Sequence, residues 1–461
     1  MRGMLIAGIA ALASLPALAT DQPKPVRHPE LDAIAAAVSP KSLREFDAAL
    51  VGFGTRSTLS DTKSDTRGIG AARRWVKSRF EAISKDCGGC LEVVTPSQVF
   101  KGKRTPAEGV EVMDVVAIQR GTSDPDRVVV ITGHLDSRCT DVMDIECDAP
   151  GANDDASGVS ALIEAARVLS KYRFAATLVY SADSGEEQGL YGGKVIAQYA
   201  VDHGWKVEAN LNNDIVGSPK GGDGQSDPHT VRVFSEGTKS NETLEQAKYR
   251  RYHGGEVDSP SRNIARYMHG LAERYLDGFR VRVMYRTDRY GRGGDQVEFL
   301  SQGFPAVRVT ESHEDYTHQH QDIRTGNGVQ YGDTIEHVDF DYLANVTRLN
   351  AITMASLAHA PAPPTGVDIA GEVAYDTTVS WKPVPGAAGY RVWWRETTAP
   401  QWEHARDAGN ATSLKLAKIN IDDYYFGVSS VSADGWDSPV VFPGFAGSFD
   451  RSPAGPGVQA E

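Results

Sequence analysis

Histidine and carboxylate side chains recur in five short segments of the chain, in types and spacing that suit metal ions. These segments are Gly133-His134-Leu135-Asp136, Gly151-Ala152-Asn153-Asp154, Gly185-Glu186-Glu187, Asn213-Asp214 and His318-Gln319-His320-Gln321-Asp322. Imidazole nitrogens and carboxylate oxygens are the usual non-thiolate ligands of zinc, and a catalytic zinc keeps one position open for water. Two histidines and three carboxylates suffice for two open sites if one carboxylate bridges the ions. The sequence therefore predicts two Zn²⁺ ions per chain.

The other acidic residues of these segments indicate the chemistry around the metals. Asp136 lies two residues after His134, where it can accept the ring N–H of that histidine or a neighbouring one and fix the tautomer of a ligand. Either Glu186 or Glu187 is then left without a metal to bind. We expect that glutamate to be a general base, which takes a proton from a water activated by both metals and passes it to the leaving amine.

Predicted strands and a helix place the first four segments close together. His134 follows the β-branched run 128–131, Glu186 and Glu187 follow residues 177–180, and Asp214 follows residues 210–212. Asp154 and Asp155 precede a helix with apolar positions at Val159, Leu162, Ile163, Ala166 and Leu169. We expect Asp155 to be an acid stabilised by the dipole of this helix. Because ligands bind outside the carboxyl ends of strands in open α/β sheets, the segments should meet in one crevice.

These motifs resemble those of the co-catalytic dizinc aminopeptidases of metallopeptidase family 28, from about residue 128 to residue 322. The His-x-Asp motif of the family matches His134 and Asp136, its Asn-Asp motif matches Asn153 and Asp154, and its Glu-Glu pair matches Glu186 and Glu187. The resemblance implies an α/β fold, a three-layer α/β/α sandwich around a mixed, mostly parallel sheet. It also implies that Asp154 bridges the metals, Glu186 is the base, Glu187 binds one zinc, and His134 and Asp214 complete the set.

The last ligand is the point where the chain departs from the family pattern. The family has a Tyr-His pair with an aspartate four residues after the histidine. His318 has that spacing to Asp322, but Thr317 stands in the place of the tyrosine, and His320 is a close competitor. We take His318 as the ligand and Tyr316 as a hydrogen-bond donor to the transition state.

The first residues predict export. Arg2 supplies a positive charge, residues 4–18 form a short apolar stretch, and Ala17-Leu18-Ala19 is a small-residue cleavage signature. Residues 1–19 are therefore interpreted as a signal peptide, with the mature chain beginning near Thr20 in the periplasm or outside the cell. This apolar stretch is too short to span a bilayer, and no later segment approaches that length.

The four cysteines suit an exported protein with disulfides. The most local of the three possible pairings joins Cys87 to Cys90 and Cys139 to Cys147. The second bridge would then brace the loop between His134 and Asp154. The rival interpretation is a structural zinc site, because Cys-x-x-Cys is a common zinc half-site.

The length of 461 residues indicates more than one domain. A helical pattern at 342–358 runs into Pro361-Ala362-Pro363-Pro364, a stiff linker, after which short strands at 378–381, 390–394 and 424–428 indicate a small all-β sandwich. This part resembles a fibronectin type III domain, with Trp381 as its core tryptophan. We expect a catalytic domain at 20–360, the fibronectin-like domain at 361–450, with a packing or spacing role, and a flexible tail at 451–461.

Charge and motifs together predict an exported exopeptidase, most simply an aminopeptidase that acts on peptide or protein N-termini. The formal net charge of −13 argues against nucleic acid as a partner, and we expect a monomer without a membrane span. A carboxypeptidase or dipeptidase would need a basic residue for the terminal carboxylate, such as Arg289, Arg292 or Arg308. A single-zinc glutaminyl cyclase and a non-catalytic receptor are further alternatives, although binding alone has no use for Glu186. Residues 218–258 could form a lid over the crevice or a surface excursion.

Overall fold

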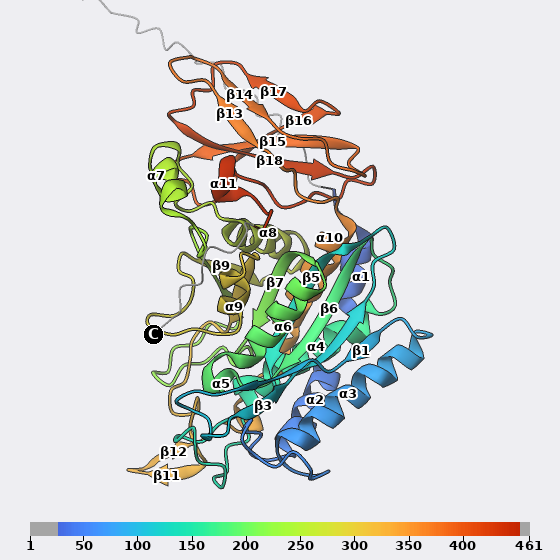
Figure 1. Ribbon diagram of the computed structural model, residues 1–461, viewed down its shortest axis with the longest axis vertical. Helices are drawn as coiled ribbons and strands as arrows, with labels where there is room; N and C mark the ends of the chain where they lie inside the picture. Colours follow the sequence, from blue (N-terminus) through green and yellow to red (C-terminus); the bar gives the residue numbers. More distant parts are fainter. Residues whose placement is uncertain (1–25, 452–461) are drawn as a thin grey trace, which may run out of the picture.

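One eight-stranded sheet lies at the centre of the larger part of the molecule (Figure 1). The structure, a computed structural model, describes residues 26–451, so the predicted signal peptide and all but the first residue of the predicted tail lie outside it. In spatial order the strands are β1 (Glu92–Val94), β4 (Val115–Gln119), β6 (Ala176–Asp183), β5 (Asp124–His134), β7 (Lys206–Asn213), β10 (Ala306–Thr310), β8 (Thr230–Ser235) and β9 (Arg280–Met284).

The sheet is mixed and mostly parallel, as predicted. Strand β5 pairs in parallel with β6 and β7, β7 with β10, and β8 with β9, while β1–β4, β4–β6 and β10–β8 are antiparallel. The β-branched run of β5 is buried on both faces, since Val129 and Ile131 pack into one hydrophobic core and Val128 and Val130 into another. A strand that is covered on both sides has no polar face, which explains its continuous apolar sequence.

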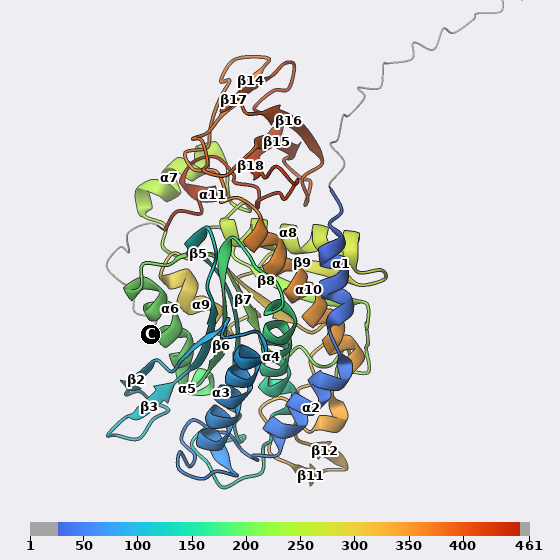
Figure 2. The same ribbon diagram turned by 90° about the vertical axis from the view of Figure 1, so that its right-hand side faces the viewer.

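Helices cover both faces of the sheet and complete the predicted three layers. Figure 2 views the sheet from its side, with α6 (Tyr191–Asp202) and α9 (Gln296–Ser301) on one face and α1 (Pro29–Ala37), α4 (Ser157–Leu169) and α10 (Phe340–His359) on the other. The second layer also contains α2 (Pro40–Val51), α3 (Gly68–Asp86) and α8 (Pro260–Tyr275), whose apolar side chains share one core with α4 and α10. All five apolar positions that predicted α4 are fully buried.

The chain continues from α10 into a small antiparallel β part. One sheet contains β13 (Asp368–Ala370), β14 (Thr377–Ser380) and β17 (Ser413–Leu416), and the other contains β16 (His404–Gly409), β15 (Gly389–Glu396) and β18 (Tyr424–Val431). Trp381 and Tyr390 lie in the core between them, with ring centroids 5.4 Å apart. The helices α7 (Leu244–His253) and α11 (Gly444–Gly447) lie beside this part, which we call the C-terminal sandwich (Figure 1).

Short elements complete the fold near the other end of the sheet. Two of these are hairpins, one of β2 (Ser97–Phe100) and β3 (Val110–Met113) and one of β11 (Arg324–Gly326) and β12 (Val329–Tyr331). The others are the π-helix η1 (Ala152–Ala156) and two single turns, α5 (Glu186–Gly189) and η2 (Ile335–His337). Cys87 is joined to Cys90 and Cys139 to Cys147, the two most local pairings, so all four thiols are used and the alternative zinc site does not form. Within residues 26–451 no helix is both long and apolar enough to cross a bilayer.

A buried ion-pair network joins the C-terminal sandwich to the α/β part. Asp258, which precedes α8, is fully buried and accepts hydrogen bonds from Arg266 Nη1 at 2.7 Å and from Arg395 Nη2 of β15 at 2.8 and 2.9 Å. Trp402 stacks its ring near both guanidinium groups, at 5.9 Å from Arg266 and 5.4 Å from Arg395.

Replacing Asp258 by alanine should lower the free energy of unfolding by about 3–5 kcal/mol, because two buried guanidinium groups lose their carboxylate. Urea unfolding followed by tryptophan fluorescence measures the change. The matched control is Asp434→Ala, at an exposed position of the sandwich, which should leave the urea midpoint unchanged. Equal midpoints for both variants would contradict the importance of this network.

Candidate metal centre

The predicted metal-binding segments meet at the carboxyl ends of three neighbouring strands. His134 is the last residue of β5, Glu186 begins α5 just after β6, and Asp214 directly follows β7. Asp154 comes from η1, immediately before α4, and reaches the same place. This end of the sheet lies opposite the C-terminal sandwich (Figure 1).

The ligand atoms form two groups that share one carboxylate. In the first group, His134 Nε2 lies 2.9 Å from Asp154 Oδ1 and 3.9 Å from Asp214 Oδ1. In the second, His320 Nε2 lies 3.2 Å from Asp154 Oδ2 and 3.3 Å from Glu187 Oε1. Each group brings three ligand atoms within 4.8 Å of one another. The two oxygens of Asp154 thus face different histidines, as a carboxylate that bridges two ions must.

The chemistry of this donor set fits zinc. Both Asp154 Oδ2 and Glu187 Oε1 are buried and accept no hydrogen bond within the described chain, although buried carboxylate oxygens normally have a partner. Burial alone would lower the pKa of His320, but the charges of Glu187 and Asp154 raise it to about 9. The carboxylates therefore hold a positive charge at this spot, and zinc would be bound by His134, Asp154 and Asp214 on one side and by Asp154, Glu187 and His320 on the other.

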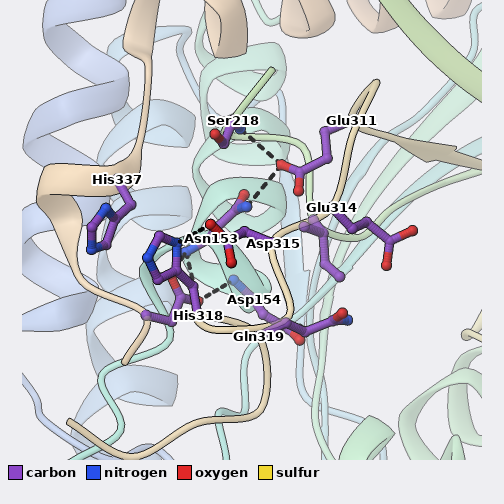
Figure 3. Close-up of a pocket in the computed structure, with 11 residues that line it drawn as sticks. Asn153, Asp154, Ser218, Glu311, Glu314, Asp315, His318, Gln319 and His337 are labelled. Atoms are coloured by element: carbon purple, nitrogen blue, oxygen red, sulfur yellow. Dashed lines mark hydrogen bonds and ion pairs between the residues drawn. The ribbon is translucent and has the colours of Figure 1, made fainter. Parts of the chain in front are cut away.

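The structure places His320 in the second group and not His318, which corrects the choice made from sequence spacing. The His318 ring stacks on His337 at 3.6 Å, and its Nδ1 lies 3.4 Å from Asp315 Oδ2 (Figure 3). Asp322, whose spacing favoured His318, instead accepts a hydrogen bond from the backbone N–H of Thr140 at 3.0 Å. His320 has a φ of 56°, so its backbone turns in the left-handed region. This turn directs the imidazole of His320 toward Asp154.

The predicted role of Tyr316 is not supported by its position. Its side chain is 67% exposed, and among the described residues it is absent from the lining of the cleft over the two groups. A hydrogen bond to a developing oxyanion requires a donor that is fixed beside the reacting carbonyl. Tyr316 comes two residues before His318, and like His318 it lies outside both metal groups.

Asp136 orients the site through both its backbone and its side chain. Its carbonyl oxygen lies 3.0 Å from His134 Nδ1, which fixes the tautomer and leaves Nε2 free for a metal. Its carboxylate lies 3.7 Å from the same Nδ1 and accepts the backbone N–H groups of Glu186 and Glu187, both at 3.3 Å. Asp136 thereby connects β5 to the turn that carries both glutamates.

Asp155 acts at the helix start, as expected, and also connects two further segments. Its carboxylate accepts backbone N–H groups of Gly158 at 3.0 Å, of His134 at 2.9 Å and of Ile215 at 3.2 Å. Residues 134 and 215 flank the first metal group. Asp155 therefore fixes the spacing between β5, β7 and α4.

Glu186 belongs to neither group and lines the cleft above them. Burial raises the pKa of Glu186 well above its usual range, and the negative charges of Glu187 and Asp214 raise it further, against the opposing effect of His134. A carboxyl group in such surroundings has a higher proton affinity, which suits a group that accepts and returns a proton.

The cleft is open, with a volume of about 630 Å³, and most of the residues that line it are polar or charged. It is lined by the metal groups, by Lys103, Arg104, Arg138, Gln188, Leu190, Arg289, Arg292 and Gln319, and by glycines 189, 291 and 293. None of residues 218–258, all of which are described, lines it. That segment forms β8 inside the sheet and α7 beside the C-terminal sandwich, so it is not a lid over the cleft.

Sequence relatives decide the family. Residues 114–350, which are 237 of the 461 residues, match the sequence profile of peptidase family M28. A probable zinc metalloprotease of Pyricularia oryzae is 44% identical over 423 residues, which are 90% of this chain and 84% of the relative. Another, of Leptosphaeria maculans, is 43% identical and covers 91% of this chain and 98% of the relative. The chain belongs to peptidase family M28. It is a zinc metalloprotease by that membership.

A solved structure supports the fold of this M28 protease. The aminopeptidase LapA of Legionella pneumophila matches with a TM-score of 0.52 and 20% sequence identity, over 77% of this chain and 80% of that one. At this identity the similarity shows the fold alone.

Arg308, one of three arginines that could have bound a terminal carboxylate in a carboxypeptidase, is bonded to the outer oxygen of Asp214. Its side chain is fully buried, with Nη1 bonded to Asp214 Oδ2 and Nη2 to the Asp214 carbonyl at 3.3 Å. Burial alone would lower the pKa of Arg308, but Asp214 and Asp288 raise it above its ordinary value. Arg308 is thus bound within the protein and turns Asp214 Oδ1 toward His134.

Replacing Arg308 by methionine should lower the free energy of unfolding of the metal-free M28 protease by about 3–5 kcal/mol, because Asp214 would stay buried without its partner. Urea titration after chelation measures this loss. Arg324→Met changes a surface arginine whose side chain is 40% exposed and should cost less than about 1 kcal/mol. A loss of unfolding free energy in Arg308→Met as small as in the control would contradict the claim that Arg308 stabilises the buried Asp214.

Two further residues that position the site carry no sequence motif. Asp333 is buried and accepts the backbone N–H of Asn153 at 2.9 Å and of Asp154 at 2.7 Å. Burial raises the pKa of Asp333 to about 7 against the effect of these two hydrogen bonds. Arg56 is fully buried and donates to the carbonyl oxygens of Leu135 at 2.9 Å and Gly151 at 3.0 Å. Both act across long sequence separations, so spacing alone offers no signal for them.

Proposed function

We propose that this M28 protease is an exported, dizinc aminopeptidase that removes N-terminal residues from peptides. The observation that supports this most directly is that Asp154 divides its two oxygens between two groups of ligand atoms, one with His134 and one with His320. One metal has no need of a shared carboxylate, whereas two neighbouring metals do.

The residues of the cleft suit hydrolysis of a peptide bond. Bound Zn²⁺ would lower the pKa of a water and polarise the scissile carbonyl. Glu186 accepts the proton of the attacking water and returns it to the leaving amine. Asp136 holds His134 and the Glu186 turn in register, and the carboxylates of the cleft attract the α-ammonium of the substrate.

Export and the role of the C-terminal sandwich are part of the same proposal. The two disulfides suit an oxidising compartment, outside the cytoplasm. For the sandwich, which we assign to the fibronectin type III class, we propose a packing role. Its aromatic residues Trp381 and Tyr390 are buried, at 5% and 6% exposure, and pack in its core. The enzyme is proposed to act as a monomer.

Hydrolysis of a panel of amino-acid p-nitroanilides tests the aminopeptidase. We expect release of p-nitroaniline from free-amine substrates, loss of activity with a chelator, recovery with Zn²⁺, and no cleavage of the N-acetylated forms. Cleavage of blocked substrates at an equal rate, or no cleavage of any free-amine substrate, would contradict the proposal.

A carboxypeptidase or dipeptidase is a second candidate, because Arg289 and Arg292 line the cleft. Both donate hydrogen bonds to Glu314, and Arg308 donates to Asp214. A terminal carboxylate would therefore compete with protein carboxylates for these arginines. Release of C-terminal residues from N-acetylated peptides would identify this activity.

A further inference from the structure

We propose that the cleft contains a binding site for a substrate carboxylate, formed by Lys103 and Arg104 on the loop between β2 and β3. This inference rests on the proposed aminopeptidase function and names its substrate class: peptides with a carboxylate near the scissile bond. The carboxylate comes either from an acidic side chain or from the C-terminus of a short peptide.

The side chains that line the cleft have an unusual balance of charge. Five of them are cationic, namely Lys103, Arg104, Arg138, Arg289 and Arg292, and Leu190 is the one large apolar side chain among the lining residues that the structure describes. Pockets for apolar side chains are lined mainly by apolar and aromatic groups. The lining residues therefore suit a polar or charged group better than a large apolar side chain, and the five cations suit an anion.

Three of the five cations already have partners in the protein. Arg138 donates to the carbonyl groups of Cys139 and Thr140 and lies 3.6 Å from Glu187 Oε2. Arg289 and Arg292 both donate to Glu314, at 3.3 and 2.9 Å.

Lys103 and Arg104 remain available to a ligand. Within residues 26–451 neither forms an ion pair with a carboxylate, and both are exposed. Arg104 uses Nη1 to donate to the backbone carbonyl of Glu187 at 3.0 Å, which places its guanidinium beside the second metal group. In the loaded enzyme two Zn²⁺ would reduce the negative charge of the carboxylates Asp154, Glu187 and Asp214, and so reduce their repulsion of a substrate anion.

The loop that carries both cations is fixed to the catalytic part. Phe100, at the end of β2, stacks on Tyr191 of α6 with centroids 4.5 Å apart. Thr105 is buried, and its hydroxyl accepts the backbone N–H of Gly102 at 2.9 Å. A Cβ at Gly102 would lie 2.1 Å from the Tyr191 hydroxyl, so a side chain at this position would displace that hydroxyl. The backbone of the loop is therefore held in place before binding, and the conformational entropy lost on binding is that of the two side chains.

Matched substrate pairs on the zinc-loaded, full-length enzyme test the site. Glutamyl and glutaminyl p-nitroanilide differ in a side-chain carboxylate, and alanyl-alanine and its amide differ in a terminal carboxylate. In at least one pair we expect the carboxylate form to have a KM roughly tenfold lower, as for a hydrogen bond to a charged group. This preference should fall as ionic strength rises. The pair that shows it identifies the source of the carboxylate.

Variants assign the preference to the loop. The double variant Lys103→Gln with Arg104→Gln should lose most of the preference, measured as the ratio of the two KM values within each substrate pair. Lys101→Gln, at an exposed position of the same loop outside the cleft lining, is the matched control and should keep it. Calorimetry with glutamate and glutamine as ligands of the same proteins gives a readout that does not depend on turnover.

The outcomes separate this inference from the proposed function. Cleavage of neutral free-amine substrates with no preference in either pair, or a preference that survives in the double variant, overturns the carboxylate site and leaves the aminopeptidase intact. Absence of cleavage of every free-amine substrate overturns the aminopeptidase itself. In that case equal calorimetric affinities within both pairs, glutamate against glutamine and alanyl-alanine against its amide, overturn the carboxylate site as well.

Discussion

Replacing Glu186 by glutamine lowers kcat by about 10²- to 10⁴-fold while both zinc ions remain bound. The amide keeps the size and the position of the side chain but cannot accept the proton of the attacking water, and general base catalysis contributes about this factor. Glu186 lines the cleft without belonging to either group of ligand atoms, so its loss should spare the metals. Initial rates on an alanyl or leucyl p-nitroanilide, with zinc content from elemental analysis, measure both effects.

The control for this variant is Glu111→Gln, which changes an exposed glutamate of β3 in the same way. Its kcat should equal that of the wild type. A kcat for Glu186→Gln within about threefold of the wild type would remove Glu186 as the base. Loss of zinc from Glu186→Gln would instead place the residue among the ligands.

Replacing His320 by alanine should release one of the two zinc ions and abolish most of the activity, whereas His318→Ala should keep both ions. His320 Nε2 lies 3.2 Å from Asp154 and 3.3 Å from Glu187, while His318 stacks on His337 outside both groups. Loss of an outer-sphere partner of a ligand already costs about 10- to 100-fold in metal affinity, so loss of the ligand itself should cost at least about 100-fold.

Competition with a zinc-sensitive dye gives the affinity of the second site in each variant. The two histidines are matched controls for one another, since both variants remove an imidazole from the same segment. A full zinc complement in His320→Ala, together with loss of zinc in His318→Ala, would restore the ligand chosen from sequence spacing.

The sequence predicted those parts of the fold and site that depend on local patterns. The β-branched run of β5 indicated a strand that is buried on both faces, and it is. Short motifs directly after β5, β6 and β7 had to converge, because neighbouring parallel strands end at the same edge of a sheet. This rule brings His134, the Glu186–Glu187 pair and Asp214 to one edge, whereas the choice of Glu187 as ligand came from the family resemblance.

The choice between His318 and His320 depends on backbone geometry that spacing does not encode. His320 adopts a φ of 56°, and Asp322 bonds to Thr140 on a loop that is closed by the Cys139–Cys147 disulfide. Contacts between distant segments decide which imidazole faces Asp154. The same holds for Tyr316, whose place in the chain says nothing about its exposure of 67%.

The residues that position the metal ligands could not be predicted from the sequence for a related reason. Arg308 lies 94 residues from Asp214 in sequence, and Asp333 lies 179 residues from Asp154. In the sequence a buried arginine or aspartate cannot be distinguished from an exposed one, because its partner lies far away along the chain. Sequence patterns identify residues with a local signature, and tertiary contacts identify those that hold them in place.

Anomalous diffraction at the zinc absorption edge, on crystals of the zinc-loaded protein, tests the dizinc centre most directly. Our account predicts two peaks, one contacted by His134, Asp154 and Asp214 and the other by Asp154, Glu187 and His320, with Glu186 contacting neither. A single peak, or a second peak bound by His318 in place of His320, would contradict it.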